Sequence, residues 1–126
     1  MPAPTISVTG PDDASLSLVE LYDGITAYVT VWSAAPERRP VEAYLQFSPG
    51  AAFLLPEKHT DSSKTVLLLE GVLQDEHGSY GPGTRMQCAI GTEHTPRSDT
   101  GALAYVIYPE REPAPADTEE PVAFPC

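Results

Sequence analysis

Residues 57–64, EKHTDSSK, bring together side chains that could do chemistry just ahead of the apolar run VLLLEG. Glu57 and His59 are two residues apart, so on an extended strand their side chains would lie on the same face. A carboxylate and an imidazole on one face are suited to binding divalent transition metals. Lys64 closes the stretch, however, and its ammonium would repel a divalent cation strongly. The segment therefore indicates either a metal site or a pocket that uses these side chains in another way.

Other chemistries have no comparable signal in this sequence. The chain contains neither GxGxxG nor GxxxxGK[ST] for binding phosphates, and no GxSxG nucleophile turn. Cys88 and Cys126 are the only cysteines and form no CxxC pair, so we do not expect a cysteine-based metal or redox site. No basic, aromatic-rich stripe suggests RNA or DNA binding.

The composition indicates one acidic domain. A chain of 126 residues can bury one modest core, and its 14 prolines and 9 glycines argue against long helices. Its formal net charge of −11 leads us to expect no nucleic acid and no anionic membrane as partner. No apolar run approaches the ~20 residues of a membrane span. The N-terminal MPAPTISVTG lacks the regions of a signal peptide, so we expect a cytoplasmic location.

The pattern along the chain predicts short strands separated by turns. Alternating, β-branched and aromatic residues predict strands over 15–22, 25–32, 41–48, 51–55, 65–75, 85–90 and 102–108, with loops over 76–84 and 91–101. Strands at this spacing indicate a sandwich or small barrel. We place an N-terminal arm at 1–14, the β-domain at 15–109 and an extended or mobile acidic, Pro-rich tail at 110–126.

The stretch GVLQDEHGSYGPGTRMQCAIGTEHTPRSDTG resembles the cupin superfamily, and more narrowly its ChrR-like, anti-sigma-factor branch. Gly83, Gly91 and His94 match three of the five defining positions of the second cupin motif, in which the histidine is a metal ligand. The resemblance covers roughly residues 41–109. It implies an all-β cupin fold, a double-stranded β-helix or jelly-roll-like barrel, and a homodimer.

The first cupin motif is where this chain departs from the family. Counting back from the glycine that ends the apolar run, Lys64 stands where the family has a metal-binding glutamate. One spacing places the family's two histidines at Lys58 and Thr60, which would bind nothing. A spacing one residue longer places them at Glu57 and His59, which keeps both on one strand face.

In the longer register the resemblance implies a site with one carboxylate and two imidazoles. Glu57, His59 and His94 would be the ligands, a set that suits Fe(II), Mn(II), Ni(II) or Zn(II). A Lys64 side chain buried in the barrel would have a lowered pKa and could take part in proton transfer or imine formation. A solvated lysine on a turn is the commoner situation and the interpretation we favour. Phe53 and Leu55 alternate in phase with Glu57, so we expect both to line the pocket.

Two classes of function fit these residues. The first is an enzyme acting on an organic small-molecule substrate in the barrel pocket. It would be a metal-dependent oxygenase if Glu57, His59 and His94 hold a metal, or otherwise a metal-free isomerase or cyclase. In the metal-free enzyme His94 would carry protons, and Glu57 or Lys64 would share the transfer. The second is a non-catalytic, ligand-sensing or regulatory cupin, as the anti-sigma branch suggests.

Overall fold

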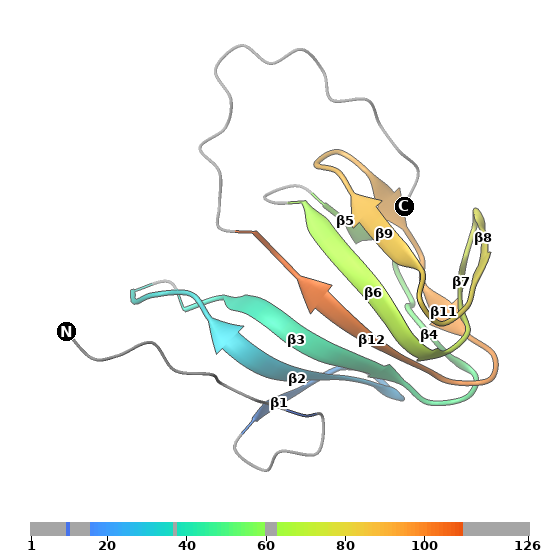
Figure 1. Cartoon of the computed structure of the whole chain (residues 1–126), viewed down its shortest axis with the longest axis horizontal. Coiled ribbons are helices and arrows are strands. Elements are labelled where there is room, and N and C mark those ends of the chain that lie inside the picture. The colour runs from blue at the N-terminus through green and yellow to red at the C-terminus, as the bar shows by residue number, and fades with distance from the viewer. Residues whose placement is uncertain (1–9, 11–15, 37, 60–62, 110–126) are drawn as a thin grey trace.

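The computed structural model describes residue 10 and residues 16–36, 38–59 and 63–109, and its regular elements in these ranges are all β-strands (Figure 1). The strands are β1 (Ser17–Tyr22), β2 (Ile25–Trp32), β3 (Pro40–Phe47), β4 (Ala51–Ala52), β5 (Glu57–Lys58), β6 (Lys64–Gly71), β7 (Leu73–Asp75), β8 (Gly78–Tyr80), β9 (Arg85–Cys88), β10 (Glu93–His94), β11 (Arg97–Ser98) and β12 (Ala102–Ile107). The predicted arm 1–14, apart from Gly10, and the predicted tail 110–126 lie outside the described residues. No helix in the described ranges is long and apolar enough to cross a membrane.

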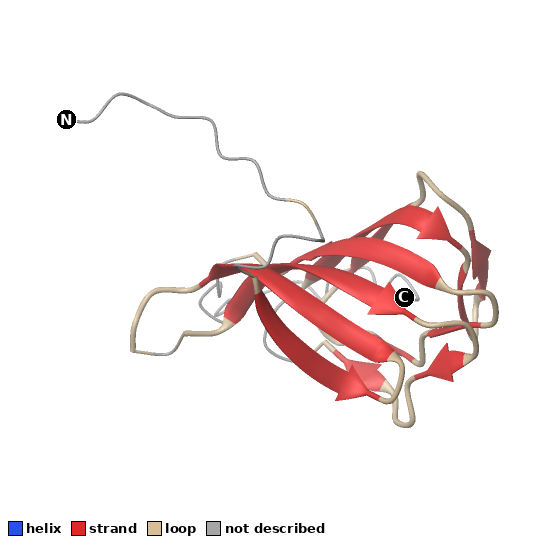
Figure 2. Ribbon diagram, turned by 90° about the horizontal axis from the view of Figure 1, so that it is seen from below, coloured by secondary structure: helices blue, strands red, loops and turns tan. Residues whose placement is uncertain are grey.

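The strands form one large sheet and two small ones, and every pair is antiparallel. The large sheet has the order β1-β2-β3-β12-β6-β9, the second β4-β11-β7-β8, and the third is the pair β10-β5. Figure 1 shows β4, β7, β8 and β11 gathered at one end of the large sheet. Figure 2 shows the long strands curving over the shorter ones. The pair β5 and β10 belongs to neither of the larger sheets.

Strict alternation along the long strands builds the core. On a strand, successive side chains point to opposite faces, so one set is buried and the other faces water. The central strands follow this rule and bury small and branched residues between the sheets, which a narrow barrel can accommodate. The buried apolar residues are Ile25, Ala27, Val29, Ala43, Leu45, Phe47, Ala51, Phe53, Val66, Leu68, Leu73, Ala102, Ala104 and Val106.

The long strands lie where the alternation predicts them and β4 lies within the strand expected over 51–55, whereas several of the other short strands were not predicted. The strand expected over 25–32 is found with those bounds. The predicted loop 76–84 contains β8, and the predicted loop 91–101 contains β10 and β11. Two- and three-residue strands carry too little alternation to be recognised in a sequence. The strand expected over 65–75 is interrupted after Gly71, giving β6 and β7.

The strand is interrupted at Gly71, where the backbone leaves the extended conformation and has no room for a side chain. The φ of Gly71 is 77°, in the left-handed region that favours glycine. A Cβ at this position would lie 2.9 Å from the Cα of Ala102, and closer still to the carbonyl oxygen of Gly101. Gly71 and Ala102 are partners in the β6–β12 pairing, so any side chain would push these two strands apart.

Gly71→Ala should therefore destabilise the fold more than a glycine replacement that meets only backbone strain. Gly83 is the matched control, because its φ is 90° and an added Cβ would meet nothing within 4 Å. We expect Gly83→Ala to lower the free energy of unfolding by about 1–2 kcal/mol and Gly71→Ala by about 3 kcal/mol or more. Urea unfolding measures both. Equal losses would contradict the close approach of β6 and β12.

Candidate functional site

Strand pairing places Glu57 and His94 opposite each other. In the β5–β10 ladder they are direct partners. The pairing continues past β5, because the His59 N–H donates to the Thr92 carbonyl at 2.9 Å and the Gly91 N–H donates to the His59 carbonyl at 2.7 Å. His59 is thereby held in the same extended segment as Glu57, two residues on and directed to the same side. The backbone thus brings the two segments that the sequence singled out into one site.

A single carboxylate oxygen is the centre of this site. Glu57 Oε1 lies 3.4 Å from His59 Nε2, 3.5 Å from His94 Nε2 and 2.6 Å from Lys64 Nζ. His94 is 1% exposed and Lys64 2%, whereas the Glu57 side chain keeps 17% of its surface exposed. All four residues that the sequence analysis proposed for the site are therefore in one cluster, with Glu57 at its solvent-accessible edge.

Asp75, which the sequence analysis did not propose, holds His94 from behind. Its Oδ2 lies 3.1 Å from His94 Nδ1, while its Oδ1 accepts hydrogen bonds from the His77 N–H and the Tyr80 hydroxyl. Burial opposes the charge of Asp75, but these donors outweigh it and its pKa is lowered. A carboxylate only accepts, so Nδ1 of His94 carries the hydrogen and Nε2 faces Glu57. The only signal in the sequence that Asp75 points inward is that it lies two residues after the apolar Leu73, on the same strand face.

Two buried nitrogens at the centre of the cluster lack hydrogen-bond partners among the described residues. They are His59 Nε2 and His94 Nε2. Their distances to Glu57 exceed those of ordinary N–H···O bonds. A buried polar atom left without a partner costs about 1–3 kcal/mol, so an arrangement with two of them side by side favours a bound group between them. A divalent cation fits these donors, because the Asp75–His94 contact is of the kind that orients metal-binding histidines.

The ionisation of the cluster also suits a cation. Burial opposes the charge of Glu57, but the His94 ring and the Lys64 ammonium outweigh it and lower its pKa to about 2. Burial lowers the pKa of His59 to about 4, because the Glu57 carboxylate offsets it only in part. At neutral pH the site therefore offers a carboxylate and a neutral imidazole, the forms in which these groups bind metals.

Lys64 is not the solvated turn residue that we favoured from the sequence. It is the first residue of β6 and alternates in phase with the buried Val66 and Leu68, so its side chain enters the barrel. The lowered pKa considered for a buried lysine is also wrong. Burial opposes its charge, but Tyr108 and the Glu57 carboxylate outweigh it and raise the pKa. Lys64 is thus a buried ammonium and not an amine available for imine formation.

Cys88 also lies beside the two histidines. Its Sγ and one nitrogen of each of His59 and His94 lie within 4.8 Å of one another. Cys88 pairs with Lys64 across β6 and β9, which explains its place in the cluster. Cys88 is disulfide-bonded, so it offers no thiolate as a metal donor. Nothing in the sequence around Cys88 indicated this proximity.

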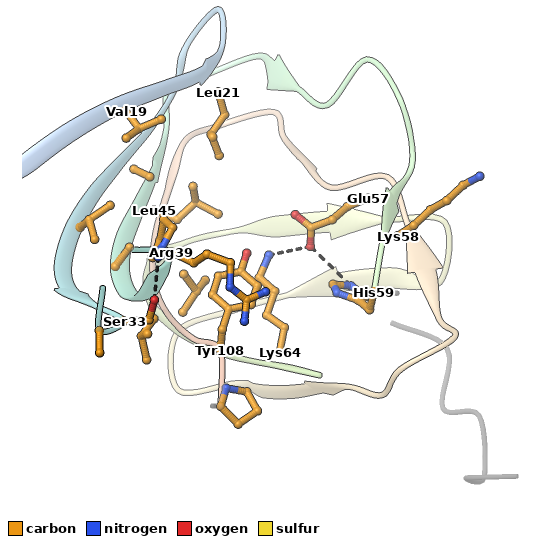
Figure 3. Close-up of a pocket in the computed structure, with 18 of the residues that line it drawn as sticks. Val19, Leu21, Ser33, Arg39, Leu45, Glu57, Lys58, His59, Lys64 and Tyr108 are labelled. Carbon is orange, nitrogen blue, oxygen red and sulfur yellow. Dashed lines mark hydrogen bonds and ion pairs between the residues drawn. The ribbon is translucent and has the colours of Figure 1, made fainter. Parts of the chain in front are cut away.

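A pocket of about 700 Å³ opens beside the cluster. Glu57, His59 and Lys64 line one end of it, and Figure 3 shows their polar atoms directed toward one another. The remaining wall is mainly apolar and comes largely from β1, β2 and β3 and from the segment between β2 and β3. The prediction that Leu55 lines this wall is wrong. Leu55 lies after the end of β4, and its side chain is 67% exposed. Phe53 is buried in the core instead of lining the pocket.

The metal-free protein should lose stability as the pH falls from about 6.5 to about 2. The pKa of His59 is lowered from 6.5 to about 4 and that of Glu57 from 4.5 to about 2, so in this range the unfolded chain binds more protons than the folded one. Melting temperatures in the presence of a chelator measure the effect. His59→Gln should reduce the loss between pH 6.5 and 4 and leave the loss at lower pH. An unchanged loss in that variant would contradict a buried neutral imidazole.

Comparison with known proteins finds similarity in structure alone. No family model matches the sequence, and no curated protein matches it. A chain in the crystal structure of Rhodobacter sphaeroides SigE in complex with the anti-sigma ChrR has a TM-score of 0.58 and 18% identity, over 75% of this chain and 50% of that one. This protein thus spans half the length of that chain.

Two further structures are similar over most of both chains. An acetylacetone dioxygenase from Acinetobacter johnsonii has a TM-score of 0.59 and 16% identity, over 86% of this chain and 80% of that one. A cupin 2 conserved barrel domain protein from Salinispora arenicola has a TM-score of 0.59 and 14% identity, over 83% and 89%. Such identities establish the fold and not the activity. The protein is a small all-β chain with the cupin fold, as the sequence resemblance implied.

Proposed function

We propose that this protein is a small-molecule enzyme that uses a divalent metal ion held by Glu57, His59 and His94. The observation that carries the proposal is the pair of buried Nε2 atoms, which have no hydrogen-bond partner among the described residues. Both lie within 3.5 Å of the same Glu57 oxygen. Two imidazoles and one carboxylate form a set that binds Fe(II), Mn(II), Ni(II) or Zn(II).

The side chains of the site divide the work between binding and positioning. His59 and His94 supply lone pairs, Glu57 supplies negative charge, and Asp75 fixes the orientation of the His94 ring. A bound divalent ion would supply Lewis-acid or redox activation. The pocket beside it would bind the apolar body of an organic substrate and exclude water from its reacting end. Because Glu57 and His59 line both the cluster and the pocket, the two are continuous.

A metal-free isomerase or cyclase has less support from the site. A general acid or base works best when its pKa is near the operating pH. Glu57 and His59, with pKa values of about 2 and about 4, are too weakly basic near neutrality. His94, the proton carrier expected from the sequence, is 1% exposed and does not line the pocket, so a substrate would not reach it directly.

If the ion is iron, we propose oxygenase chemistry, and the similar fold of a dioxygenase is consistent with it.

Lys64 favours a second candidate function, a ligand-sensing cupin without catalysis. Its ammonium already neutralises Glu57 at 2.6 Å, where the resemblance would put another metal ligand. The similar fold of a chain in an anti-sigma complex is consistent with that candidate. The homodimer and the cytoplasmic location remain predictions.

Protein purified without a histidine tag, stripped and then reconstituted, should hold close to one metal ion per chain. Plasma mass spectrometry after incubation with Fe(II), Mn(II), Ni(II) or Zn(II) measures this. His94→Ala should lose most of the metal because it removes one of the three donors, whereas His77→Ala should keep it. His77 is exposed and contacts Asp75 through its backbone N–H. Wild-type protein that stays metal-free after reconstitution would contradict the proposal and favour the second candidate.

Lys64→Glu should strengthen metal binding by about tenfold or more and weaken the metal-free fold. The change removes a repelling cation and adds a carboxylate close to Glu57, which repels it until a cation binds between them. Chelator competition gives the affinity, and melting with and without metal gives the stability. Lys64→Gln, which removes the charge without adding a donor, should show a smaller gain. Unchanged affinity in Lys64→Glu would mean that the side chain at position 64 does not face the metal donors.

A further inference from the structure

The ammonium of Lys64 has more hydrogen-bonding capacity than the structure uses. An ammonium carries three donors. One of them goes to Glu57 Oε1 at 2.6 Å. Lys64 is 2% exposed, but it lines the end of the pocket, where a ligand could reach it. Tyr108 also lies beside the ammonium, with its ring centroid 5.7 Å from Nζ, and its side chain engages a second donor, which leaves the third.

The net charge at this end of the pocket changes sign when a divalent metal binds. Lys64 and Glu57 neutralise each other there, and Asp75 adds one negative charge behind His94. A divalent ion on the proposed donors would leave one positive charge uncompensated in a poorly hydrated site. This step rests on the proposed function. Such an excess favours the entry of a single negative charge, because Coulomb forces are strong where water is excluded.

The rest of the pocket adds no negative charge to compete for this place. Among the described residues that line it, the charged ones are Arg39, Glu57, Lys58 and Lys64. Figure 3 shows the Lys58 ammonium directed away from the pocket, while Arg39 lies on the wall between Ser33 and Tyr108. Glu57 is therefore the single anion of this lining, and it is already paired.

We propose that the natural ligand of the pocket is an amphipathic organic monoanion whose charged oxygen accepts a hydrogen bond from Lys64. A carboxylate, enolate or phenolate on an apolar body has this chemistry. The body would contact the apolar wall, which includes Ala27, Val29, Leu45 and Val106. Lys64 would then hold the charged group next to the metal donors, because the same ammonium already contacts Glu57.

The test uses a pair of probes that differ in charge and little in shape, octanoate and octanamide. Calorimetric titration of the metal-reconstituted protein should show octanoate binding at least about tenfold more tightly, the size expected of one charge-assisted hydrogen bond. Lys64→Met keeps most of the apolar stem and should abolish this preference. Lys64→Arg should retain part of it. Lys58→Met is the matched control and should leave it unchanged, because Lys58 points away from the pocket.

Metal content measured on the same samples separates this inference from the proposed function. Equal binding of octanoate and octanamide by metal-loaded protein would overturn the inference and leave the metal site intact. A preference that survives in metal-loaded Lys64→Met would assign anion binding to the metal or to Arg39 and overturn the role of Lys64. If Lys64→Met does not fold, equal affinities for the two probes in wild-type protein would still overturn the inference.

Discussion

The buried contact between the Lys64 ammonium and the Glu57 carboxylate is the interaction on which the site depends. Taking either charge out of water alone would be very unfavourable, and breaking a buried pair by removing one partner costs about 3–5 kcal/mol. At 2.6 Å the pair holds Glu57 in a position where its oxygen faces both histidines. Tyr108 and the charge of Glu57 in turn keep Lys64 protonated inside the barrel. Each residue thus helps to keep the other charged.

The fold supplies this pair through strand register and not through local sequence. β5 and β10 place Glu57 opposite His94, and the start of β6 turns Lys64 inward across from Cys88. A slip of one residue in either pairing would turn the functional side chains to the outer face. The long strands β2, β3, β6 and β12 resist such slips because each carries a buried apolar set. The core therefore protects the site geometry even though β5 and β10 are only two residues long.

The sequence predicts the parts of this structure that are encoded in alternation over many residues. The long strands and the shared face of Glu57 and His59 follow from the period of two, and the cupin fold follows from the resemblance around His94. Lys64 was misplaced because the strand was started at Thr65 and the lysine was assigned to the preceding turn, although Lys64 shares the phase of Val66. Asp75 could not be assigned, because its contact with His94 spans 19 residues and depends on how separate sheets pack.

A lysine in place of a metal-binding glutamate changes the charge of the pocket more than it changes the ability of the site to hold a cation. The three remaining donors still converge, and the Asp75 support behind His94 is complete. Exchanging a negative for a positive side chain moves the local charge by two units, which weakens the hold on a metal and strengthens the attraction for an anion. A site built this way works best when metal and anionic ligand are bound together, because each then supplies the charge that the other lacks. On this view Lys64 couples metal binding to ligand binding and is not a relic of a lost metal centre.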